Sequence, residues 1–188
     1  MAHPRLQTAR GIIIRRRVIG EADRMLTLFT REMGKCTVIA KGIRRITSRR
    51  APRLELLSHV DVYLYKGKTW STVSDVTTIT SYPRIATSLP HMSVAYYLCE
   101  LVDALLPADQ EHEAVYDFMV AAFSSLETLD ESDLTDFQVA ATSSLLRTLG
   151  YMSVGPTLTS LELRAYIERI IERKLKSYAF LTTNTTSA

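Results

Sequence analysis

The 188-residue sequence has little of what marks fibrous, secreted or membrane-spanning proteins. It holds only 7 Gly and 6 Pro while 46% of its residues are hydrophobic, which excludes collagen-like and low-complexity chains and favours a globular protein. No apolar run approaches the roughly 18 residues that a membrane-spanning helix needs, and the start of the chain lacks the apolar core of a secretory signal. We therefore expect a cytoplasmic protein without a membrane partner.

Metal-binding and catalytic signatures are also missing. The only two cysteines, Cys36 and Cys99, cannot by themselves build a four-ligand zinc site. The stretch HEAVY at 112–116 begins like a zinc-protease helix, but Tyr116 stands where the second His is required. Gly67-Lys68-Thr69 resembles the end of a phosphate-binding loop without its first Gly, and we expect a hairpin turn there. The sequence predicts a protein that is not an enzyme, with no metal and no cofactor.

Acidic residues are scarce in the first third of the chain. Residues 1–68 hold 16 Lys and Arg against 5 Asp and Glu, a net charge of +11. Residues 69–188 hold 7 against 15, a net charge of −8, so the total of +3 conceals a strong asymmetry. A positive field confined to one lobe attracts a polyanion to that lobe alone, which favours two domains with different partners.

The basic lobe has the pattern of β structure. Five segments rich in β-branched or alternating apolar residues predict strands, and the Glu-Met-Gly turn at 32–34 can close a hairpin. The expected strands are 11–18, 25–30, 35–40, 59–65 and 69–82. Between the third and fourth, residues 42–53 carry five Arg and no acid, which predicts a mobile, exposed loop. Five short strands in about 80 residues suit a small closed barrel of the OB type or a compact sandwich.

From Pro83 onward the apolar period lengthens towards 3.6 residues, which predicts helices. The expected helices are 91–106, 115–129, 133–149 (ending at Gly150) and 161–180, with a break at Gly155-Pro156 before the last. The predicted fold class is α+β: an OB-fold domain over 1–82, an all-helical domain over 83–181 and a disordered tail over 182–188.

A cationic surface with nearby aromatics is what single-stranded nucleic acid requires, because phosphates meet the charges and bases stack on the rings. Tyr63, Tyr65 and Trp70 flank the 66–68 turn, although we expect some of these rings to fill the barrel core. An ordinary solvated surface is the alternative. On a strand, Arg15 and Arg17 share one face and Arg16 points to the other. The candidate DNA-binding residues are Arg15, Arg16, Arg17, Arg24, Lys35, Lys41, Arg44, Arg45, Arg49, Arg50, Arg53, Lys66, Lys68 and Trp70.

Several ordered blocks resemble the RecO family of bacterial recombination mediators. In the basic lobe these are GEADR at 20–24, LTLF at 26–29, the Gly34-Lys35 turn, AKG at 40–42 with Arg44-Arg45, and DVYLYKG at 61–67. In the helical part they are YYLCELVDALLP at 96–107, LLRTLGY at 145–151 and ERKLKSYAFL at 172–181. Each block is degenerate, but the ordered set is specific and covers most of the chain.

The resemblance implies a non-catalytic protein that binds single- and double-stranded DNA through an OB-fold and anneals complementary strands. It also implies action with RecR and the single-stranded DNA-binding protein to help RecA load, near the nucleoid. The family's contact with the acidic tail of the single-strand-binding protein lies in the helical domain. Here the basic residues Arg169, Arg173, Lys174 and Lys176 are weak candidates for a partner contact.

The sequence departs from the family pattern at one interval. Many members carry a four-Cys zinc module between the Gly-Tyr block and the last helix, whereas this chain has MSVGPTLTS at 152–160. The resemblance therefore implies a short form without zinc. Two other functions stay open: an adaptor whose basic lobe docks an acidic protein surface, and an RNA-binding OB protein of translation.

Overall fold

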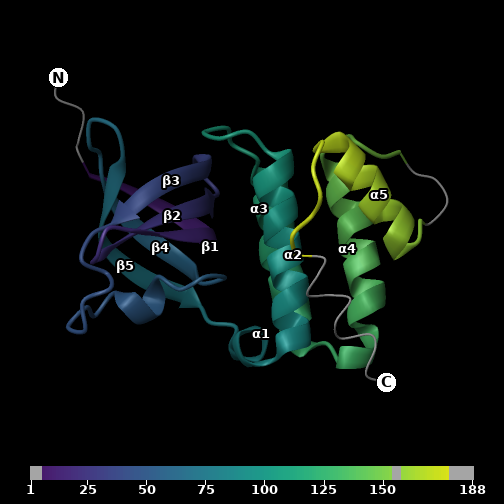
Figure 1. Ribbon diagram of the computed structural model, residues 1–188, viewed down its shortest axis with the longest axis horizontal. Helices are drawn as coiled ribbons and strands as arrows, with labels where there is room; N and C mark the ends of the chain where they lie inside the picture. The colour runs from purple at the N-terminus through teal and green to yellow at the C-terminus, as the bar shows by residue number, and fades with distance from the viewer. Residues whose placement is uncertain (1–5, 154–157, 178–188) are drawn as a thin grey trace. The chain divides into compact units, whose positions relative to one another are not determined.

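The computed structural model describes residues 6–153 and 158–177 and divides the chain into two compact units (Figure 1). The first unit is Met1–Ser81 with Leu106–Glu113, and the second is Tyr82–Leu105 with Ala114–Ala188. The expected break at Gly155-Pro156 and the expected tail at 182–188 lie outside the described residues. No helix among the described residues is long and apolar enough to cross a membrane.

The first unit is a closed five-stranded barrel, as the alternating segments predict. Its strands are β1 (Leu6–Ile19), β2 (Asp23–Thr30), β3 (Gly34–Ala40), β4 (His59–Tyr65) and β5 (Ser71–Thr80). They close in the order β1-β2-β3-β5-β4, and only the β3–β5 pair is parallel. The β3–β5 ladder that closes the barrel is short, pairing Val38 with Ser71 and Ile39 with Thr72, as expected of an OB-type barrel, which is partly open.

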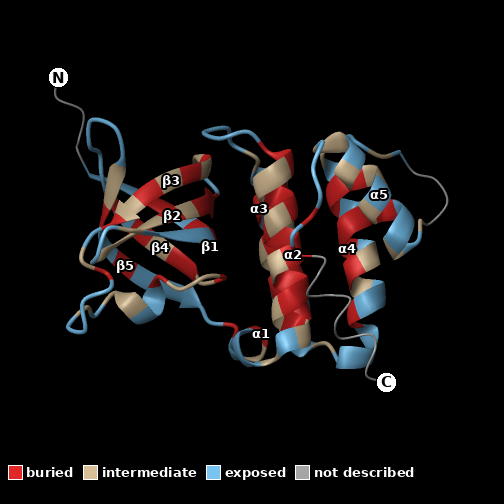
Figure 2. Cartoon of the chain, in the orientation of Figure 1, coloured by how far each residue is buried: buried red, intermediate tan, exposed pale blue. Residues whose placement is uncertain are grey.

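The barrel core comes from the inward face of each strand. The strands carry alternating buried and less buried positions (Figure 2). In β3 every second residue is buried, and in β4 Val60, Val62 and Leu64 belong to the buried core. Because side chains alternate along a strand, Tyr63 and Tyr65 must point outward, and both are exposed. Our expectation that some of these aromatics fill the core is therefore wrong.

A register shift in β1 changes which face its arginines occupy. The shift lies between Ile13 and Arg15, and beyond it Arg16 is paired with the buried Leu26. Directly paired residues share a face, so Arg16 lies on the core side at the mouth of the barrel. Arg15 and Arg17, paired with Thr27 and Met25, lie on the outer side, which confirms the predicted split.

The β2–β3 turn holds the segment Leu106–Glu113 against the barrel. The Asp109 amide donates to the Lys35 carbonyl at 2.8 Å, and Arg31 pairs with Glu113. Gly34 adopts a left-handed φ of 63°, and a Cβ there would lie 1.7 Å from the Gln110 carbonyl oxygen. The turn therefore requires glycine on two counts, backbone conformation and space.

The second unit contains five helices among the described residues. They are α1 (Pro83–Thr87), α2 (Leu89–Leu105), α3 (Glu113–Thr128), α4 (Leu134–Thr148) and α5 (Ser160–Ile170). Leu98 in α2, Met119 in α3 and Leu145 in α4 have fully buried side chains. Each of these helices carries buried positions along one side (Figure 2). The predicted helices over 91–106, 115–129 and 133–149 are confirmed to within two residues, whereas α1 was not predicted.

The last helix is shorter than the predicted 161–180. It begins with a capping box between Thr159 and Glu162, and it ends at Ile170. Glu172 then takes a left-handed φ of 52°, and the Leu175 amide donates to the Glu168 carboxylate at 3.1 Å. Amides that would continue the helix bind acidic side chains instead, and residues 178–180 lie outside the described residues.

Candidate nucleic-acid interface

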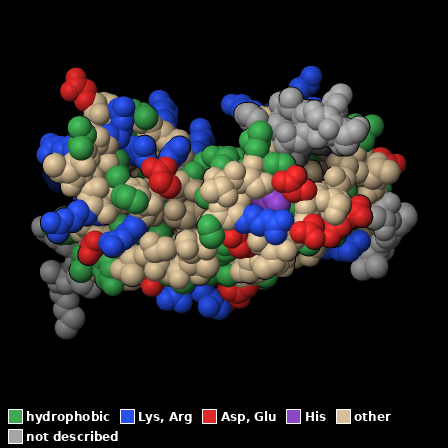
Figure 3. All heavy atoms as spheres, turned by 90° about the horizontal axis from the view of Figure 1, so that it is seen from below, with side chains coloured by type: hydrophobic (Ala, Val, Ile, Leu, Met, Phe, Trp, Pro, Cys, Tyr) green, Lys and Arg blue, Asp and Glu red, His purple; other side chains and the backbone are tan. Residues whose placement is uncertain are grey.

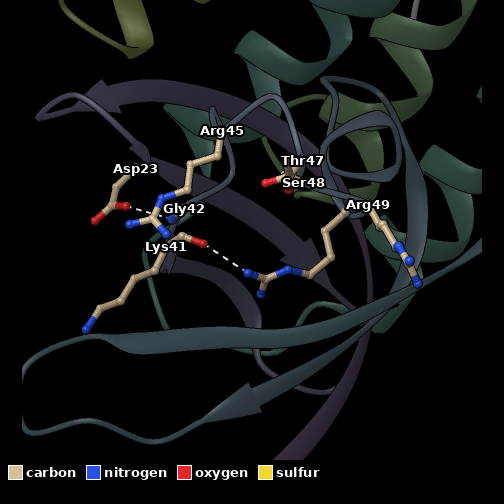
Figure 4. A pocket seen from close by; sticks show the side chains of 8 residues that line it. Asp23, Lys41, Gly42, Arg45, Thr47, Ser48 and Arg49 are labelled. Atoms are coloured by element: carbon tan, nitrogen blue, oxygen red, sulfur yellow. Dashed lines mark hydrogen bonds between the residues drawn. The ribbon is translucent and has the colours of Figure 1, made fainter.

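An open pocket of about 580 Å³ lies at one end of the barrel, between the β2 start and the loop that follows β3 (Figure 4). Four cationic side chains and one carboxylate line it, together with two hydroxyl groups. The lining residues are Asp23, Lys41, Gly42, Arg45, Thr47, Ser48, Arg49 and Arg50. Excess positive charge beside hydroxyl donors is suited to a phosphate group. The hydroxyl residues were absent from the sequence-based candidates.

The first part of the loop is fixed to the β1–β2 turn. The Gly42 amide donates to Asp23 Oδ1 at 2.7 Å, and the Arg44 amide donates to the Ala22 carbonyl at 3.0 Å. The Arg44 guanidinium donates to the Glu21 carbonyl at 2.9 Å. Arg44 is one of the residues predicted to contact phosphate. Its guanidinium instead bonds the loop to the β1–β2 turn.

The second part of the loop is fixed to β5 and to Lys41, the residue that follows β3. Arg50 donates to the carbonyls of Val73 at 2.6 Å, Ser74 at 3.2 Å and Lys41 at 2.9 Å. Arg53, in the 3₁₀ turn Ala51–Arg53, donates to the Val76 carbonyl at 3.4 Å. The predicted loop is exposed, and the guanidinium groups of Arg50 and Arg53 bond it to the barrel backbone.

Two further candidates are held by one carboxylate. Glu55 pairs with Arg16 and, at 2.8 Å, with Arg24 at the barrel mouth. Burial, followed by repulsion from Arg16 and Arg44, lowers the pKa of Arg24. These two charges are partly compensated, so they are weaker phosphate ligands than an unpaired arginine.

The charged groups of the remaining pocket cations have no partner among the described residues. Within residues 6–153 and 158–177, no hydrogen bond or ion pair engages the side chains of Lys41, Arg45 or Arg49. All three are exposed and line the same pocket (Figure 4). They are therefore available to neutralise phosphates. The predicted cations thus fall into two groups. In one group the guanidinium is bonded to the barrel backbone, and in the other no described residue engages the charged group.

Other candidates lie away from the pocket or beside it. Lys35, at the start of β3, lies about 20 Å from Lys41 along the strand. Arg15 and Arg17 are exposed on the outer side of β1. Lys66 and Lys68 are exposed in the β4–β5 turn.

Three aromatic side chains on β4 or in the turn after it are exposed. Tyr63, Tyr65 and Trp70 are 36%, 43% and 44% exposed. Tyr63 is paired with Asp75, and the Ser74 hydroxyl donates to the Tyr63 carbonyl at 2.9 Å. Arg50, which lines the pocket, also binds the Ser74 carbonyl, so Ser74 contacts both Arg50 and the Tyr63 backbone. Tyr63 and Tyr65 were not among the candidate DNA-binding residues. The alternation of buried residues along β4 nevertheless predicts that both side chains point outward.

The C-terminal basic residues do not form one open patch. Arg173 pairs with Glu100 at 2.9 Å, and Arg169 lies over the Tyr166 ring at 5.3 Å. Lys174 and Lys176 are exposed.

The described residues contain no group of three or more His, Cys, Asp or Glu placed to hold a metal ion. Cys36 and Cys99 are both buried free thiols. Burial, with a smaller effect of Asp109, raises the pKa of Cys36 to about 12, and burial also raises the pKa of Cys99. Neither thiol is a ready metal ligand or nucleophile.

The charge distribution visible on the surface follows the two units. On the face drawn in Figure 3, Lys and Arg side chains crowd the barrel at the left, and acidic side chains gather on the helical unit.

Comparison with known families gives the decisive observation: the model described as recombination protein O N terminal matches residues 1–82, and that described as recombination protein O C terminal matches residues 86–161. The chain belongs to the RecO family.

Curated relatives support this assignment. The chain is 37% identical over 150 residues to the DNA repair protein RecO of Symbiobacterium thermophilum, covering 80% of this chain and 58% of that protein. It is 35% identical over 143 residues to the DNA repair protein RecO of Desulfitobacterium hafniense, covering 76% and 51%. The chain thus spans about half the length of these RecO relatives. The resemblance identified from the sequence blocks is confirmed.

Proposed function

We propose that this RecO-family chain is a non-catalytic DNA-binding mediator of recombinational repair that captures single strands at the barrel. The observation that carries the proposal is the pocket in which Lys41, Arg45 and Arg49 are exposed and unengaged by described residues, on a loop fixed to the barrel. Such a pocket binds phosphates without reading sequence, and counterion release supplies most of the affinity.

Annealing follows from the same charges. Two complementary strands repel one another through their phosphates, and a surface that neutralises them lowers the barrier to pairing. The exposed rings of Tyr63, Tyr65 and Trp70 support a preference for unpaired bases, since a ring stacks on a base only when the base is not covered by its neighbours.

The partners of the mediator are part of the proposal. In this function RecR and the single-stranded DNA-binding protein act with the chain to help RecA load in the cytoplasm, at the nucleoid. The exposed Lys174 and Lys176 of the helical unit are the better residues with which to test a partner contact, because Arg173 is already paired.

The test is fluorescence anisotropy of a labelled single strand over a salt series. The wild type is compared with a triple variant, Lys41→Ala, Arg45→Ala and Arg49→Ala. The control is Arg169→Ala, Lys174→Ala and Lys176→Ala, which removes the same charge from the other unit. Because single strands release about 0.7 counterion per contact, we expect the slope of log affinity against log salt to flatten by about 2 in the pocket variant alone.

Absence of wild-type binding at low salt overturns the proposal. Equal losses in the two triple variants would assign binding to total charge instead of the pocket. Binding of an acidic peptide without any binding of DNA would favour the adaptor function.

A further inference from the structure

One apolar side chain stands out on the basic loop. Ile46 is 104% exposed, whereas Leu161, the next most exposed large apolar residue among those described, is 67% exposed. A single exposed apolar residue is common on protein surfaces and needs no explanation by itself. The position of Ile46 does call for an explanation, because this residue lies between the cations of the candidate interface.

The backbone presents Ile46 at the tip of a closed turn. The Ser48 amide donates to the Arg45 carbonyl at 2.9 Å, which leaves Ile46 and Thr47 as the central residues. The Arg45 amide donates to the Gly42 carbonyl at 3.2 Å, and Arg50 ties the far end of the loop to β5. Isoleucine is β-branched and stiff at its first torsion. The side chain is therefore held out from the barrel in few orientations.

The neighbours of Ile46 favour nucleic acid as its occupant. Arg45 and Thr47 line the pocket but Ile46 does not, so the apolar group stands beside the phosphate site instead of filling it. Arg45 and Arg49 lie on either side in the chain, with no described residue engaging their guanidinium groups. A strand whose phosphates occupy this pocket brings its bases next to the apolar tip, and an apolar protein surface would leave these cations uncompensated.

We propose that Ile46 is a wedge that inserts between two neighbouring bases of the bound strand and separates their stack. The inference rests on the proposed DNA binding and adds a residue that alters the bases themselves. Apolar side chains that enter a base step open it at the cost of stacking, and nearby phosphate contacts offset that cost. A strand with one opened step offers its bases to a complementary strand, which links the wedge to annealing.

The test uses single-stranded oligonucleotides with 2-aminopurine at successive positions, because stacking quenches its fluorescence. With the wild-type chain at saturating concentration, we expect an increase of about twofold or more at one or two positions. Ile46→Ala should remove this increase while changing the dissociation constant by less than about threefold, since the lost contact and the avoided unstacking offset one another. Ile46→Leu should restore it.

Leu161→Ala is the matched control, because it shortens an exposed aliphatic side chain in the helical unit and should leave the increase intact. An unchanged increase in Ile46→Ala, a loss in both variants, or wild-type binding without any increase overturns the wedge and leaves DNA binding standing. Failure of the wild type to bind overturns both proposals.

Discussion

The guanidinium of Arg50 donates to the carbonyl of Lys41 at 2.9 Å, so the side chain that closes the basic loop is bonded to the backbone of a residue that lines its pocket. The same guanidinium reaches the carbonyls of Val73 and Ser74 on β5. One arginine thus joins β5, the residue after β3 and the far end of the loop. This arrangement makes Arg50 a positioning residue for the cations beside it.

We predict that Arg50→Ala lowers the free energy of unfolding by about 2 kcal/mol, because three carbonyls lose a charged donor. Arg50→Lys should recover little of this, since an ammonium cannot reproduce the planar fork. Urea unfolding measures the change. Arg49→Ala is the control: its side chain is exposed, so stability should stay within about 0.5 kcal/mol while DNA affinity falls. Equal stability of Arg49→Ala and Arg50→Ala would contradict the positioning role.

The two faces of β1 give a second prediction. Arg17 lies on the outer side with no described partner for its charged group, whereas Arg16 pairs with Glu55. We expect Arg17→Ala to weaken single-strand binding. The slope of log affinity against log salt should flatten by about 0.7. Arg16→Ala should do less, because its charge is already compensated. Fluorescence anisotropy over a salt series compares the two variants. Identical losses of DNA affinity would contradict a DNA-binding surface on the outer face of β1.

A converse variant tests the compensation itself. Glu55→Gln removes the carboxylate that holds Arg16 and Arg24. If the carboxylate restrains these cations, the variant should bind a single strand more tightly than the wild type, by roughly threefold to tenfold for about 1 kcal/mol of exposed pairing released. A weaker affinity would mean that Glu55 is needed to shape the barrel mouth.

Much of the barrel could be predicted because its signals are local. The alternation of Val60, Val62 and Leu64 between polar or aromatic residues defines β4 to the residue, and it also implies that Tyr63 points outward. The expectation that some of the aromatics fill the core failed because Tyr63 and Tyr65 alternate with the buried residues of this strand. A large side chain on the outer face of a strand stays outside whatever its hydrophobicity.

The support of the basic loop could not be predicted, because its bonds join distant parts of the chain. Arg50 binds carbonyls 23 and 24 residues away, and Arg44 binds the Glu21 carbonyl 23 residues before it. From the sequence every loop arginine looks like a phosphate ligand. Only the fold shows which guanidinium groups meet a carbonyl and which meet solvent. The early end of α5 could not be predicted either. The amides of Leu175 and Ser177, which follow this helix, bind the carboxylates of Glu168 and Glu100 instead of continuing the helix.

Glycine at the β2–β3 turn leads to a fourth prediction. A Cβ at Gly34 would lie 1.7 Å from the Gln110 carbonyl, whereas a Cβ at Gly20 would meet nothing within 4 Å. Both glycines have positive φ, at 63° and 54°. Gly20→Ala therefore measures the backbone penalty alone, about 1–2 kcal/mol. Gly34→Ala should cost at least about 2 kcal/mol more, because the segment 106–113 must move as well. Thermal unfolding of both variants checks this, and equal losses would show that the contact is dispensable.

The last prediction concerns Glu100, whose carboxylate gathers the segment after α5. It accepts hydrogen bonds from the Ser177 hydroxyl at 2.7 Å, the Ser177 amide at 2.8 Å, the Lys176 amide at 3.1 Å and Arg173 at 2.9 Å. Burial by itself would raise the pKa of Glu100, but these hydrogen bonds outweigh it and the pKa is lowered.

A lowered folded pKa means that the ionised carboxylate stabilises the fold above the ordinary glutamate pKa of about 4.3, and that this stabilisation is lost as the pH falls through the folded value. At pH 7 we expect Glu100→Gln to lower the free energy of unfolding by about 2 kcal/mol, since the charged acceptor is lost. The difference between wild type and variant should shrink as the pH drops below about 4. Arg173→Ala, which leaves three of the four donors, should lose less at pH 7. A difference that stays constant from pH 7 to pH 3 would show that the ionised carboxylate does not hold this segment.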